Sequence, residues 1–282
     1  MLKLGLIGSG ISRTQVHKLH GLMGELSGLK VQYDLFDEPN PKEFDLLAKL
    51  HWCKQNGYTG VNVTHPFKLQ AFLLLDDTSQ FPDGLVSVNT ILLNAQGMRG
   101  YNTDHSGFIE AYRAHFGDRK PGPVMMMGAG GVGVAIGFGL ARLGADSIAI
   151  CDTQRERAEE LATRLQLVGA KTRVVPHEPE ELFRCASQSD GLINATPIGM
   201  NQYPGNPFPE PCFSGRRWAF EAIYTPPNTE FVLSARRHAM SIIGGFELFL
   251  HQGIDAFEHF SGIRIDRAHI VATYKARFPQ PI

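Results

Sequence analysis

The N-terminal part of the chain alternates short apolar runs with longer segments in which apolar and polar residues are mixed. Apolar runs of this length, rich in β-branched residues and ended by Gly or Pro, predict strands, and the mixed segments predict helices. We expect strands at 2–7, 30–36, 60–64 and 85–93, and helices at 14–23 and 41–56. Gly57 follows the second helix, where a glycine can adopt the left-handed conformation that ends a helix. Strands that alternate with helices favour parallel pairing in an α/β layer structure.

A second series of the same kind follows the segment 118–123, which holds three charged residues, two prolines and one glycine. A change in composition of this sort is typical of a domain boundary. Beyond it we expect strands at 124–127, 147–151, 172–175, 191–194 and 218–222, and helices at 135–143 and 155–167. From about Ala235 onward the pattern predicts mostly helix, most clearly at 247–260. The pattern predicts two α/β domains, because 282 residues are too many for one typical core.

Composition and charge exclude several classes of partner. The 27 Lys and Arg residues balance 28 Asp and Glu residues, so we expect no attraction to nucleic acid or to an anionic membrane. No apolar stretch approaches the roughly 20 residues of a membrane span. The cysteines are scattered without a C-x-x-C pair, which favours reduced thiols in a cytoplasmic protein; they are Cys53, Cys151, Cys185 and Cys212. His17 and His20 share one helix face, but no third ligand stands at a recognised spacing, so we predict no metal site.

The sharpest local signal is a glycine-rich turn between the predicted strand 124–127 and a helix of small residues. The turn has the spacing G-x-G-x-x-G and consists of Gly128, Ala129, Gly130, Gly131, Val132 and Gly133. In such a turn the first glycine permits the tight bend, the second admits a pyrophosphate, and the third lets the helix pack against the strand. The strand before it and the helix after it favour a dinucleotide site over a turn without a ligand.

An acidic residue stands about 20 residues further on, where this type of site requires one. Asp152 ends the next predicted strand, and a carboxylate there can accept hydrogen bonds from the ribose hydroxyls and repel a 2′-phosphate. This favours NAD over NADP. Arg155 and Arg157 could pair with a 2′-phosphate if they turned inward, or could lie on the solvated face of the helix 155–167.

A hydride transfer also requires a group that moves the hydroxyl proton. Lys68 follows the predicted strand 60–64 by one turn, and Asp104 follows the extended segment 85–93 and the residues Asn102 and Thr103. A buried lysine beside a carboxylate can hold a proton in position for transfer. Taken singly, the lysine could equally lie at the surface and the Asn-Thr-Asp segment could be a turn stabilised by its asparagine side chain.

Six motifs in order along the chain resemble those of the shikimate dehydrogenase family. They are Asn62-Val63-Thr64-His65-Pro66-Phe67-Lys68, Val88-Asn89-Thr90, Asn102-Thr103-Asp104 with Gly107, Asn194-Ala195-Thr196-Pro197-Ile198-Gly199-Met200, Tyr224 with Pro226 and Thr229, and Gly245 with Gln252. The resemblance spans nearly the whole chain and implies a reaction at the C3 hydroxyl or ketone of shikimate or quinate.

The resemblance also implies a role for each matching residue. Lys68 and Asp104 would be the proton-transfer pair. The substrate, a small cyclic polyhydroxy acid, would be bound by Ser12, Thr14, Asn62, Thr64, Asn89, Tyr224 and Gln252. The nicotinamide ring would be bordered by Thr196, Pro197 and Gly245. A polyhydroxylated acid needs several convergent partners, because each buried hydroxyl left unpaired costs about 1–3 kcal/mol.

Several departures from the family pattern point to its NAD-preferring quinate/shikimate dehydrogenase branch. The usual S-x-S-P is Ser12-Arg13-Thr14-Gln15 here, Leu248 replaces a methionine, and Glu221 replaces an aspartate. Asp152-Thr153 stands where NADP-using members have N-R-[ST]. The methyl group of Thr14 would crowd the carboxylate end of the substrate, where quinate and shikimate differ.

We therefore predict an α/β fold with two domains and a cleft between them. Residues 1–106 and 238–282 would form the substrate-binding domain, and residues 107–237 the Rossmann-like NAD(P)-binding domain. The sequence leaves open a homodimer, the preference between shikimate and quinate, and a strict choice between NAD and NADP. Alternative functions are a ligand-sensing homologue without turnover, or the same chemistry on an amino-substituted shikimate analogue. A one-carbon dehydrogenase would share the two-domain outline, but the Asn102 and Tyr224 motifs do not suit it.

Overall fold

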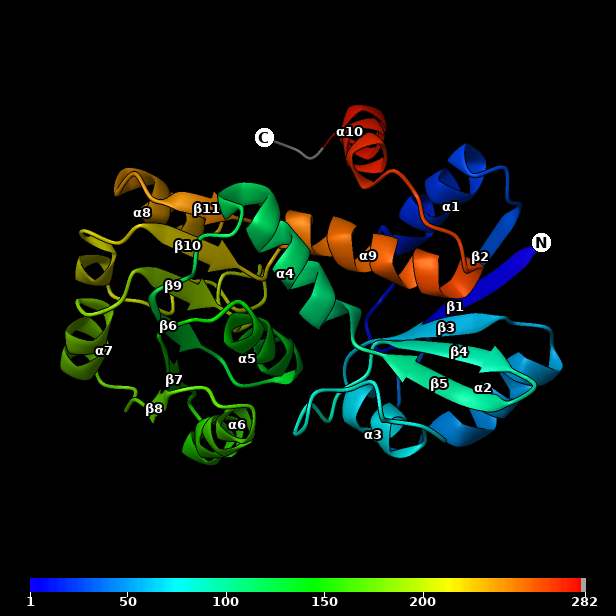
Figure 1. The fold of residues 1–282 in the computed structure, drawn as a ribbon, viewed down its shortest axis with the longest axis horizontal. Helices are drawn as coiled ribbons and strands as arrows, with labels where there is room; N and C mark the ends of the chain where they lie inside the picture. Colours follow the sequence, from blue (N-terminus) through cyan, green and yellow to red (C-terminus); the bar gives the residue numbers. More distant parts are fainter. Residues whose placement is uncertain (280–282) are drawn as a thin grey trace. The chain divides into compact units, whose positions relative to one another are not determined.

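The computed structural model describes residues 1–279 (Figure 1). Contacts divide these residues into two compact units. Unit 1 comprises Met1–Phe81, Val86–Gly107 and Leu250–Pro279, and unit 2 comprises Pro82–Leu85 and Phe108–Phe249. The boundaries at 107 and 250 fall inside two helices, α4 (Thr103–Phe116) and α9 (Gly245–Ser261). The division of functions between the two domains stays a prediction, and so do the domain bounds and the cleft.

Unit 1 contains a five-stranded mixed sheet in the order β2-β1-β3-β4-β5 (Figure 1). Its strands are β1 (Leu2–Gly8), β2 (Val31–Asp37), β3 (Gly60–Val63), β4 (Thr90–Asn94) and β5 (Gly97–Tyr101). Strand β1 pairs in parallel with β2 and β3, whereas β4 pairs antiparallel with both β3 and β5. The expected parallel pairing therefore holds for β1, β2 and β3 but not for β4, and β5 is a strand that the sequence did not predict. Two residues connect these strands, and a connection so short permits only an antiparallel hairpin.

Two helices of unit 1, α2 (Leu46–Gln55) and α10 (Arg267–Arg277), begin at an aspartate whose side chain caps the helix. The others are α1 (Val16–Leu26), α3 (Lys68–Leu73), the start of α4 and most of α9. Helix α2 starts five residues later than predicted, because Asp45 Oδ1 accepts a hydrogen bond from the backbone N–H of Ala48 at 2.9 Å and so caps the helix there. Fully buried side chains such as Ile7, Leu50 and Val61 pack between the sheet and α2.

Unit 2 contains a six-stranded, wholly parallel sheet in the order β11-β10-β9-β6-β7-β8. Its strands are β6 (Pro123–Met127), β7 (Ser147–Cys151), β8 (Thr172–Val174), β9 (Gly191–Asn194), β10 (Trp218–Glu221) and β11 (Ser241–Ile243). Strand β6, the first along the chain, lies between β7 and β9, so the strand order reverses beside it. In open α/β sheets such a reversal opens a crevice at the carboxyl ends of the strands, where ligands bind. The predicted α/β class with a Rossmann-like second sheet is confirmed.

Helices of unit 2 connect these strands. They are the remainder of α4, α5 (Gly131–Arg142), α6 (Arg155–Leu167), α7 (Pro179–Ala186), α8 (Glu230–Arg237) and a short 3-10 helix, η1 (Glu210–Phe213). Strand β11 belongs to this sheet, although the sequence after Ala235 looked mostly helical. A strand of three residues is too short to show a period, and its pairing with β10 is what identifies it.

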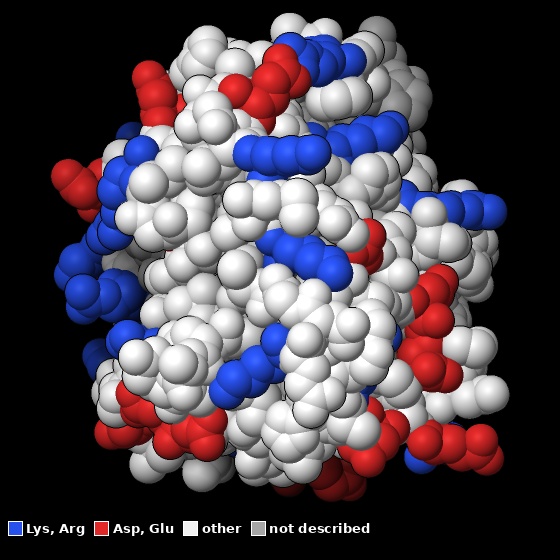
Figure 2. All heavy atoms as spheres, turned by 90° about the vertical axis from the view of Figure 1, so that its right-hand side faces the viewer, with Lys and Arg blue, Asp and Glu red and all other residues white. Residues whose placement is uncertain are grey.

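The distribution of surface charge agrees with the balanced composition. Lys and Arg side chains are interspersed with Asp and Glu side chains on the face shown in Figure 2. All four cysteines are buried and free. Within residues 1–279, none of the helices has the length and apolar character needed to cross a bilayer.

Candidate active site

Lys68 and Asp104 form an ion pair in unit 1. Lys68 is the first residue of α3, and Asp104 lies in the first turn of α4. The distance between Lys68 Nζ and Asp104 Oδ2 is 2.5 Å, and their side chains are only 14% and 11% exposed. The surface position that the sequence left open for Lys68 is therefore excluded. A pair so shielded from water is held strongly in place, because removing either partner would leave an uncompensated charge.

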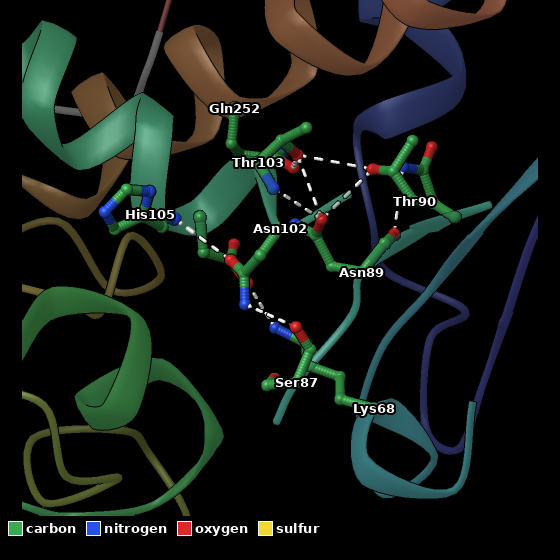
Figure 3. Close-up of polar contacts among 10 residues, drawn as sticks. Lys68, Ser87, Asn89, Thr90, Asn102, Thr103, His105 and Gln252 are labelled. Atoms are coloured by element: carbon green, nitrogen blue, oxygen red, sulfur yellow. Dashed lines mark hydrogen bonds and ion pairs between the residues drawn. The ribbon is translucent and has the colours of Figure 1, made fainter. Parts of the chain in front are cut away.

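The motif Asn102-Thr103-Asp104 folds as a capped helix start. Asn102 Oδ1 accepts from the backbone N–H of His105 at 3.0 Å, and its Nδ2 donates to the carbonyl of Ser87 at 2.9 Å (Figure 3). The Asn turn proposed as an alternative thus exists, and it is what presents Asp104 to Lys68. Lys68 is anchored by its neighbour Phe67, which is 2% exposed, and by a hydrogen bond from Val88 N to its carbonyl at 3.1 Å.

The predicted substrate residues Asn89 and Gln252 lie in the same polar cluster. Asn89 Oδ1 accepts from the backbone N–H of Thr103 at 2.8 Å, and Thr103 Oγ1 lies 3.4 Å from Gln252 Oε1 (Figure 3). Gly107 makes this approach possible, since a Cβ atom at that position would stand 2.6 Å from the backbone nitrogen of Gln252. Helix α9 can therefore pack closely on α4 and bring Gln252 beside the motif that holds Asp104.

The other predicted substrate residues of unit 1 line the ends of β1 and β3. Ser9 N donates to the carbonyl of His65 at 3.0 Å, which ties the loop before Ser12 to the segment after Thr64. Gly8 has no room for a side chain, because a Cβ atom there would stand 2.3 Å from Thr64 Cγ2. Ser12 is exposed and Thr14 partly buried. No side-chain contact in the described structure brings either of them to the Lys68 pair.

Asn62 is buried, and its amide is engaged at both ends. Tyr33 donates its hydroxyl proton to Asn62 Oδ1 at 2.8 Å, and Asn62 Nδ2 donates to the carbonyl of Asn89 and to Thr90 Oγ1. The sequence grouped Asn62 with the substrate ligands and did not single out Tyr33 or Thr90. Thr90 and Thr103 stand in the quoted motifs, which is the signal that could have identified them. Tyr33 has no local signal, because its partner lies 29 residues away on another strand.

The glycine turn of unit 2 has the geometry of a dinucleotide cradle. Gly128 has a φ of +99°, which favours glycine, and a Cβ atom on Gly133 would stand 2.1 Å from the carbonyl oxygen of Gly128. Gly130 caps α5 without a side-chain hydrogen bond, and a Cβ atom there would meet nothing within 4 Å. The first turn of α5 therefore presents backbone N–H groups, including those of Gly131 and Val132, next to open space that can admit a phosphate.

Asp152 connects this turn to the next strand. Its Oδ2 accepts from the N–H of Ala129 at 2.8 Å, and its Oδ1 accepts from the N–H of Gln154 at 2.9 Å. The carboxylate thus lies directly beside the glycine turn at the end of β7. Arg155 pairs with Glu159 at 2.7 Å along the exposed face of α6, which is the solvated arrangement that the sequence had left as one alternative.

Thr196 belongs to a turn that is organised by a buried carboxylate. Asn194 Oδ1 accepts from both the N–H and the hydroxyl of Thr196, at 3.0 and 2.7 Å, while Asn194 Nδ2 donates to Glu221. Glu221 also accepts from Thr229 Oγ1 at 2.6 Å and is fully buried. Burial raises the pKa of Glu221 to about 7, although its hydrogen bonds act in the opposite direction. This network fixes the turn and shows why an acid is required at 221.

The remaining predicted residues of unit 2 lie near the ends of β9 and β10. Pro197 is exposed and follows Thr196 in the turn. Gly245 begins α9, where a Cβ atom would stand 2.4 Å from the carbonyl oxygen of Ala222. The ring of Tyr224 stacks on Phe249, with ring centroids 5.5 Å apart. Residues 1–279 contain no group of three His, Cys, Asp or Glu side chains that could hold a metal ion.

Comparison with known proteins identifies the family. A family model for the shikimate dehydrogenase substrate binding domain matches residues 6–91. A quinate/shikimate dehydrogenase (NAD(+)) of Corynebacterium glutamicum is 31% identical over 274 residues, which covers 96% of this chain and 97% of that protein. The chain belongs to the shikimate dehydrogenase family. The resemblance inferred from the motifs and the predicted enzyme class, an oxidoreductase of the shikimate/quinate dehydrogenase type, are both confirmed.

Solved structures of this family give the same result. Quinate dehydrogenase from Corynebacterium glutamicum in complex with NAD is similar with a TM-score of 0.88 and 31% identity, covering 98% of this chain and 99% of that one. Shikimate 5-dehydrogenase from Thermus thermophilus in complex with NADP(H) and shikimate is similar with a TM-score of 0.85 and 28% identity, over 98% and 99% of the two chains. A shikimate dehydrogenase (NADP(+)) of an Arthrobacter species is also 31% identical, over 95% of this chain and 94% of that protein. Relatives named for NADP are thus nearly as similar as those named for NAD, and the preference of this chain for NAD stays a prediction.

Proposed function

We propose that this chain is an NAD-dependent dehydrogenase that interconverts shikimate with 3-dehydroshikimate, quinate with 3-dehydroquinate, or both, by hydride transfer at C3. The observation that carries the proposal is the shielded Lys68–Asp104 pair at the edge of a cluster of polar side chains in unit 1. A sensor without turnover has no need of a buried proton-transfer pair. The names of relatives of both kinds support the substrate class.

In the proposed reaction Lys68 moves the proton and Asp104 holds Lys68 in position. During oxidation Lys68 acts as a neutral amine, its own proton having first gone to solvent, and accepts the proton of the C3 hydroxyl while the hydrogen on C3 leaves as hydride. During reduction the same ammonium group returns the proton to the new alkoxide oxygen. NAD, when bound, supplies or accepts the hydride. Asn89, Gln252 and Thr64 would bind the ring hydroxyls.

The substrate carboxylate would be bound by Ser12 and Thr14, with Tyr224 nearby. Asn62 belongs with these substrate residues in the family pattern. All of these groups are hydrogen-bonding side chains, as a polyhydroxylated acid requires.

The residues of unit 2 fit a dinucleotide. The glycine turn offers backbone N–H donors and an open space beside Gly130, and Asp152 offers a carboxylate for the ribose hydroxyls. We assign the pyrophosphate to the turn 128–133, the adenosine ribose to Asp152, and the nicotinamide border to Thr196, Pro197 and Gly245. Asp152 favours NAD over NADP because it would repel a 2′-phosphate. Because all four cysteines are free and buried, we also propose that the chain works in the reducing cytoplasm.

Turnover of Lys68→Ala tests the proposal. NADH formation is measured with NAD and either shikimate or quinate, and the variant should lower kcat by about 10²–10⁴ with little change in KM, the range expected for a general acid or base. Lys54→Ala, which removes an exposed lysine from the same unit, should leave both constants unchanged. Near-full turnover by Lys68→Ala would remove Lys68 from the mechanism, and a wild type inactive with both acids and both nucleotides would refute the proposed function.

A further inference from the structure

A single buried carboxylate receives hydrogen bonds from both ends of the loop 222–229 in unit 2. This loop connects β10 to α8. Near its start the backbone N–H of Ile223 donates to Glu221 Oε1 at 3.0 Å, and at its end the hydroxyl of Thr229 donates to Glu221 Oε2 at 2.6 Å. Glu221 has no exposed surface and Thr229 is 2% exposed. Water therefore has little access to these groups, and each must find its partner within the protein.

The described groups that face the Glu221 carboxylate are all donors. The N–H of Ile223 can only donate. Thr229 Oγ1 accepts from the N–H of Val232 at 3.2 Å, which caps α8, and directs its own proton to Glu221. Asn194 Nδ2 donates to the same carboxylate and lies 3.0 and 3.1 Å from its two oxygens. An ionised carboxylate, with two oxygens and no proton, can accept from all three groups.

The direction of the Asn194 amide does not depend on Glu221. Asn194 Oδ1 accepts from the N–H of Thr196 at 3.0 Å, and its Nδ2 donates to the carbonyl of Ile198 at 3.0 Å. Both partners are backbone groups with a fixed role, so they orient the amide by themselves. The loop differs, because Glu221 Oε1 is the one described acceptor of the Ile223 N–H among residues 1–279. The loop is therefore the part of this network that depends most on the carboxylate.

Tyr224 follows Ile223 directly in this loop. Its ring stacks on Phe249 of α9, with ring centroids 5.5 Å apart and an interplanar angle of 23°. The start of the loop also lies close to the first residue of that helix, since a Cβ atom on Gly245 would stand 2.8 Å from the carbonyl carbon of Ile223. The hydrogen bond from Ile223 to Glu221 thus sets the position from which the tyrosine ring reaches Phe249.

We propose that Glu221 is a positioning residue for Tyr224: its carboxylate ties both ends of the loop 222–229 together and so presents the tyrosine hydroxyl to the carboxylate of the substrate. The inference rests on the proposed function, which puts Tyr224 near the substrate carboxylate, and deepens it. Glu221 itself contacts neither substrate nor nucleotide. It acts on the affinity for the cyclic acid and not on the transfer at C3, because the substrate carboxylate takes no part in the reaction and is bound alike in the ground state and the transition state.

Kinetics of Glu221→Gln test this proposal. The measurements are made at about pH 8, because burial raises the pKa of Glu221 to about 7 and the wild-type carboxylate must be ionised. Glutamine keeps the shape but has one oxygen, which cannot accept from both ends of the loop. The KM for the cyclic acid should rise about three- to tenfold, as for the loss of one oriented hydrogen bond, while kcat and the KM for NAD each stay within about twofold.

Glu210→Gln is the matched control. It also removes a carboxylate of unit 2 that is bonded to α8, where Glu210 Oε2 accepts from Ser234 at 2.6 Å and from Arg237 at 2.8 Å. It leaves the loop 222–229 untouched and should leave all three constants unchanged. An unchanged KM for the acid in Glu221→Gln, or an equal rise of the KM for NAD, would overturn the proposal.

A double-mutant cycle separates positioning from a general loss of structure. Tyr224→Phe keeps a ring on Phe249 and removes the hydroxyl through which Glu221 is proposed to act. In this background Glu221→Gln should raise the KM for the acid no further. Additive effects of the two substitutions would contradict the positioning role.

The Thr229 end of the loop gives a second test that leaves Glu221 in place. Thr229→Val keeps a similar shape without the hydroxyl and should raise the KM for the acid as Glu221→Gln does. Thr229→Ser keeps the hydroxyl and should restore a KM close to that of the wild type. Glu221→Gln leaves the cap of α8 intact, so agreement between the valine and glutamine variants assigns the effect to the loop. Equal KM values for Thr229→Val and Thr229→Ser would overturn the proposal, and this pair decides it if Glu221→Gln does not fold.

Deuterium exchange in the ligand-free protein keeps the inference independent of the substrate. The backbone amides of 223–229 should exchange faster in Glu221→Gln than in the wild type or in Glu210→Gln, while those of 195–200 exchange as in the wild type. Equal exchange of the loop in the two variants would overturn the positioning role even if the enzyme is active. If the wild type turns over no cyclic acid, the proposed function fails, while the exchange rates still decide whether Glu221 holds the loop.

Discussion

Replacement of His20 by leucine tests how much of the acid sensitivity of unit 1 comes from one buried imidazole. His20 lies on α1 with no exposed surface, and neither of its ring nitrogens has a hydrogen-bond partner in the described structure. It is packed against Tyr33, Phe257 and Phe260. Burial lowers the pKa of His20 to about 3 from its ordinary value of 6.5. The neutral imidazole is therefore a condition for the folded core.

The expected loss of stability follows from proton linkage. Below pH 6.5 the unfolded chain binds a proton at His20, whereas the folded chain does so only near pH 3, so stability falls as the pH is lowered through this window. At pH 5 the pH lies about 1.5 units below the pKa of histidine in the unfolded chain. This corresponds to a loss of about 2 kcal/mol in the free energy of unfolding relative to neutral pH. The value at pH 5 does not depend on the folded-state pKa as long as that pKa lies well below 5.

Urea unfolding at pH 7 and pH 5 measures this contribution. Leucine is close to histidine in volume and cannot be protonated, so the free energy of unfolding of His20→Leu should fall by about 2 kcal/mol less than that of the wild type over the same pH change. Any change in packing is common to both pH values and cancels in the comparison. His51→Leu, at an exposed position of α2, should lose as much as the wild type. Equal losses for His20→Leu and the wild type would refute the argument.

Two further predictions concern selectivity. Asp152→Asn keeps an oxygen for the N–H of Ala129 but removes the charge, so the ratio of kcat/KM for NAD to that for NADP should fall roughly tenfold or more. Asp146→Asn, at an exposed position, should leave that ratio alone, and an unmoved ratio in Asp152→Asn would show that the carboxylate does not select the nucleotide. Thr14→Ser removes one methyl group and should change the quinate-to-shikimate ratio of kcat/KM about fivefold or more. If the ratio is the same as in an exposed Thr59→Ser control, specificity lies elsewhere.

Local patterns were sufficient for those parts of the fold that depend on neighbouring residues. The apolar run before Gly128 and the small residues after it identified β6, the turn and α5, because each requirement of that turn acts within a few positions. The end of α2 near Gly57 was predicted for the same reason. Lys68 and Asp104 lie 36 residues apart, and only their place in two family motifs brought them together before the ion pair was seen.

Long-range register explains what the sequence did not reveal. Strand β4 was expected to be parallel because the strands before it alternate with helices, yet it pairs antiparallel with β3 and, across a two-residue turn, with β5. Tyr33 reaches Asn62 because β1 pairs in parallel with both β2 and β3, so that Tyr33 and Gly60 both align with Leu4. Nothing in the sequence near Tyr33 encodes this alignment. The roles of such residues become visible only when the order and register of the strands are known.

The residues of the Asn102 motif show why a motif can identify the family more firmly than the substrate. Asn102 caps α4, Thr103 donates to Asn89, Asp104 pairs with Lys68, and Gly107 admits the backbone of Gln252. Each position meets a demand of the fold or of the Lys68–Asp104 ion pair, so a change at any of them would disturb contacts that the fold needs.

The loop that carries Ser12 and Thr14 is constrained differently. Its described hydrogen bonds are made largely by the backbone, such as Thr14 N to the carbonyl of Ile11 at 3.0 Å, and Ser12 is exposed. Thr14 is partly buried and its Oγ1 accepts from the N–H of Val16 at the start of α1, at 3.3 Å, a hydroxyl that serine would keep. A substitution of the exposed Ser12, or Thr14→Ser, should therefore change the free energy of unfolding by less than about 0.5 kcal/mol. If this loop binds the substrate carboxylate as proposed, substrate preference can change there while the core motifs stay the same. In this chain that loop is also where the pattern departs from the usual one.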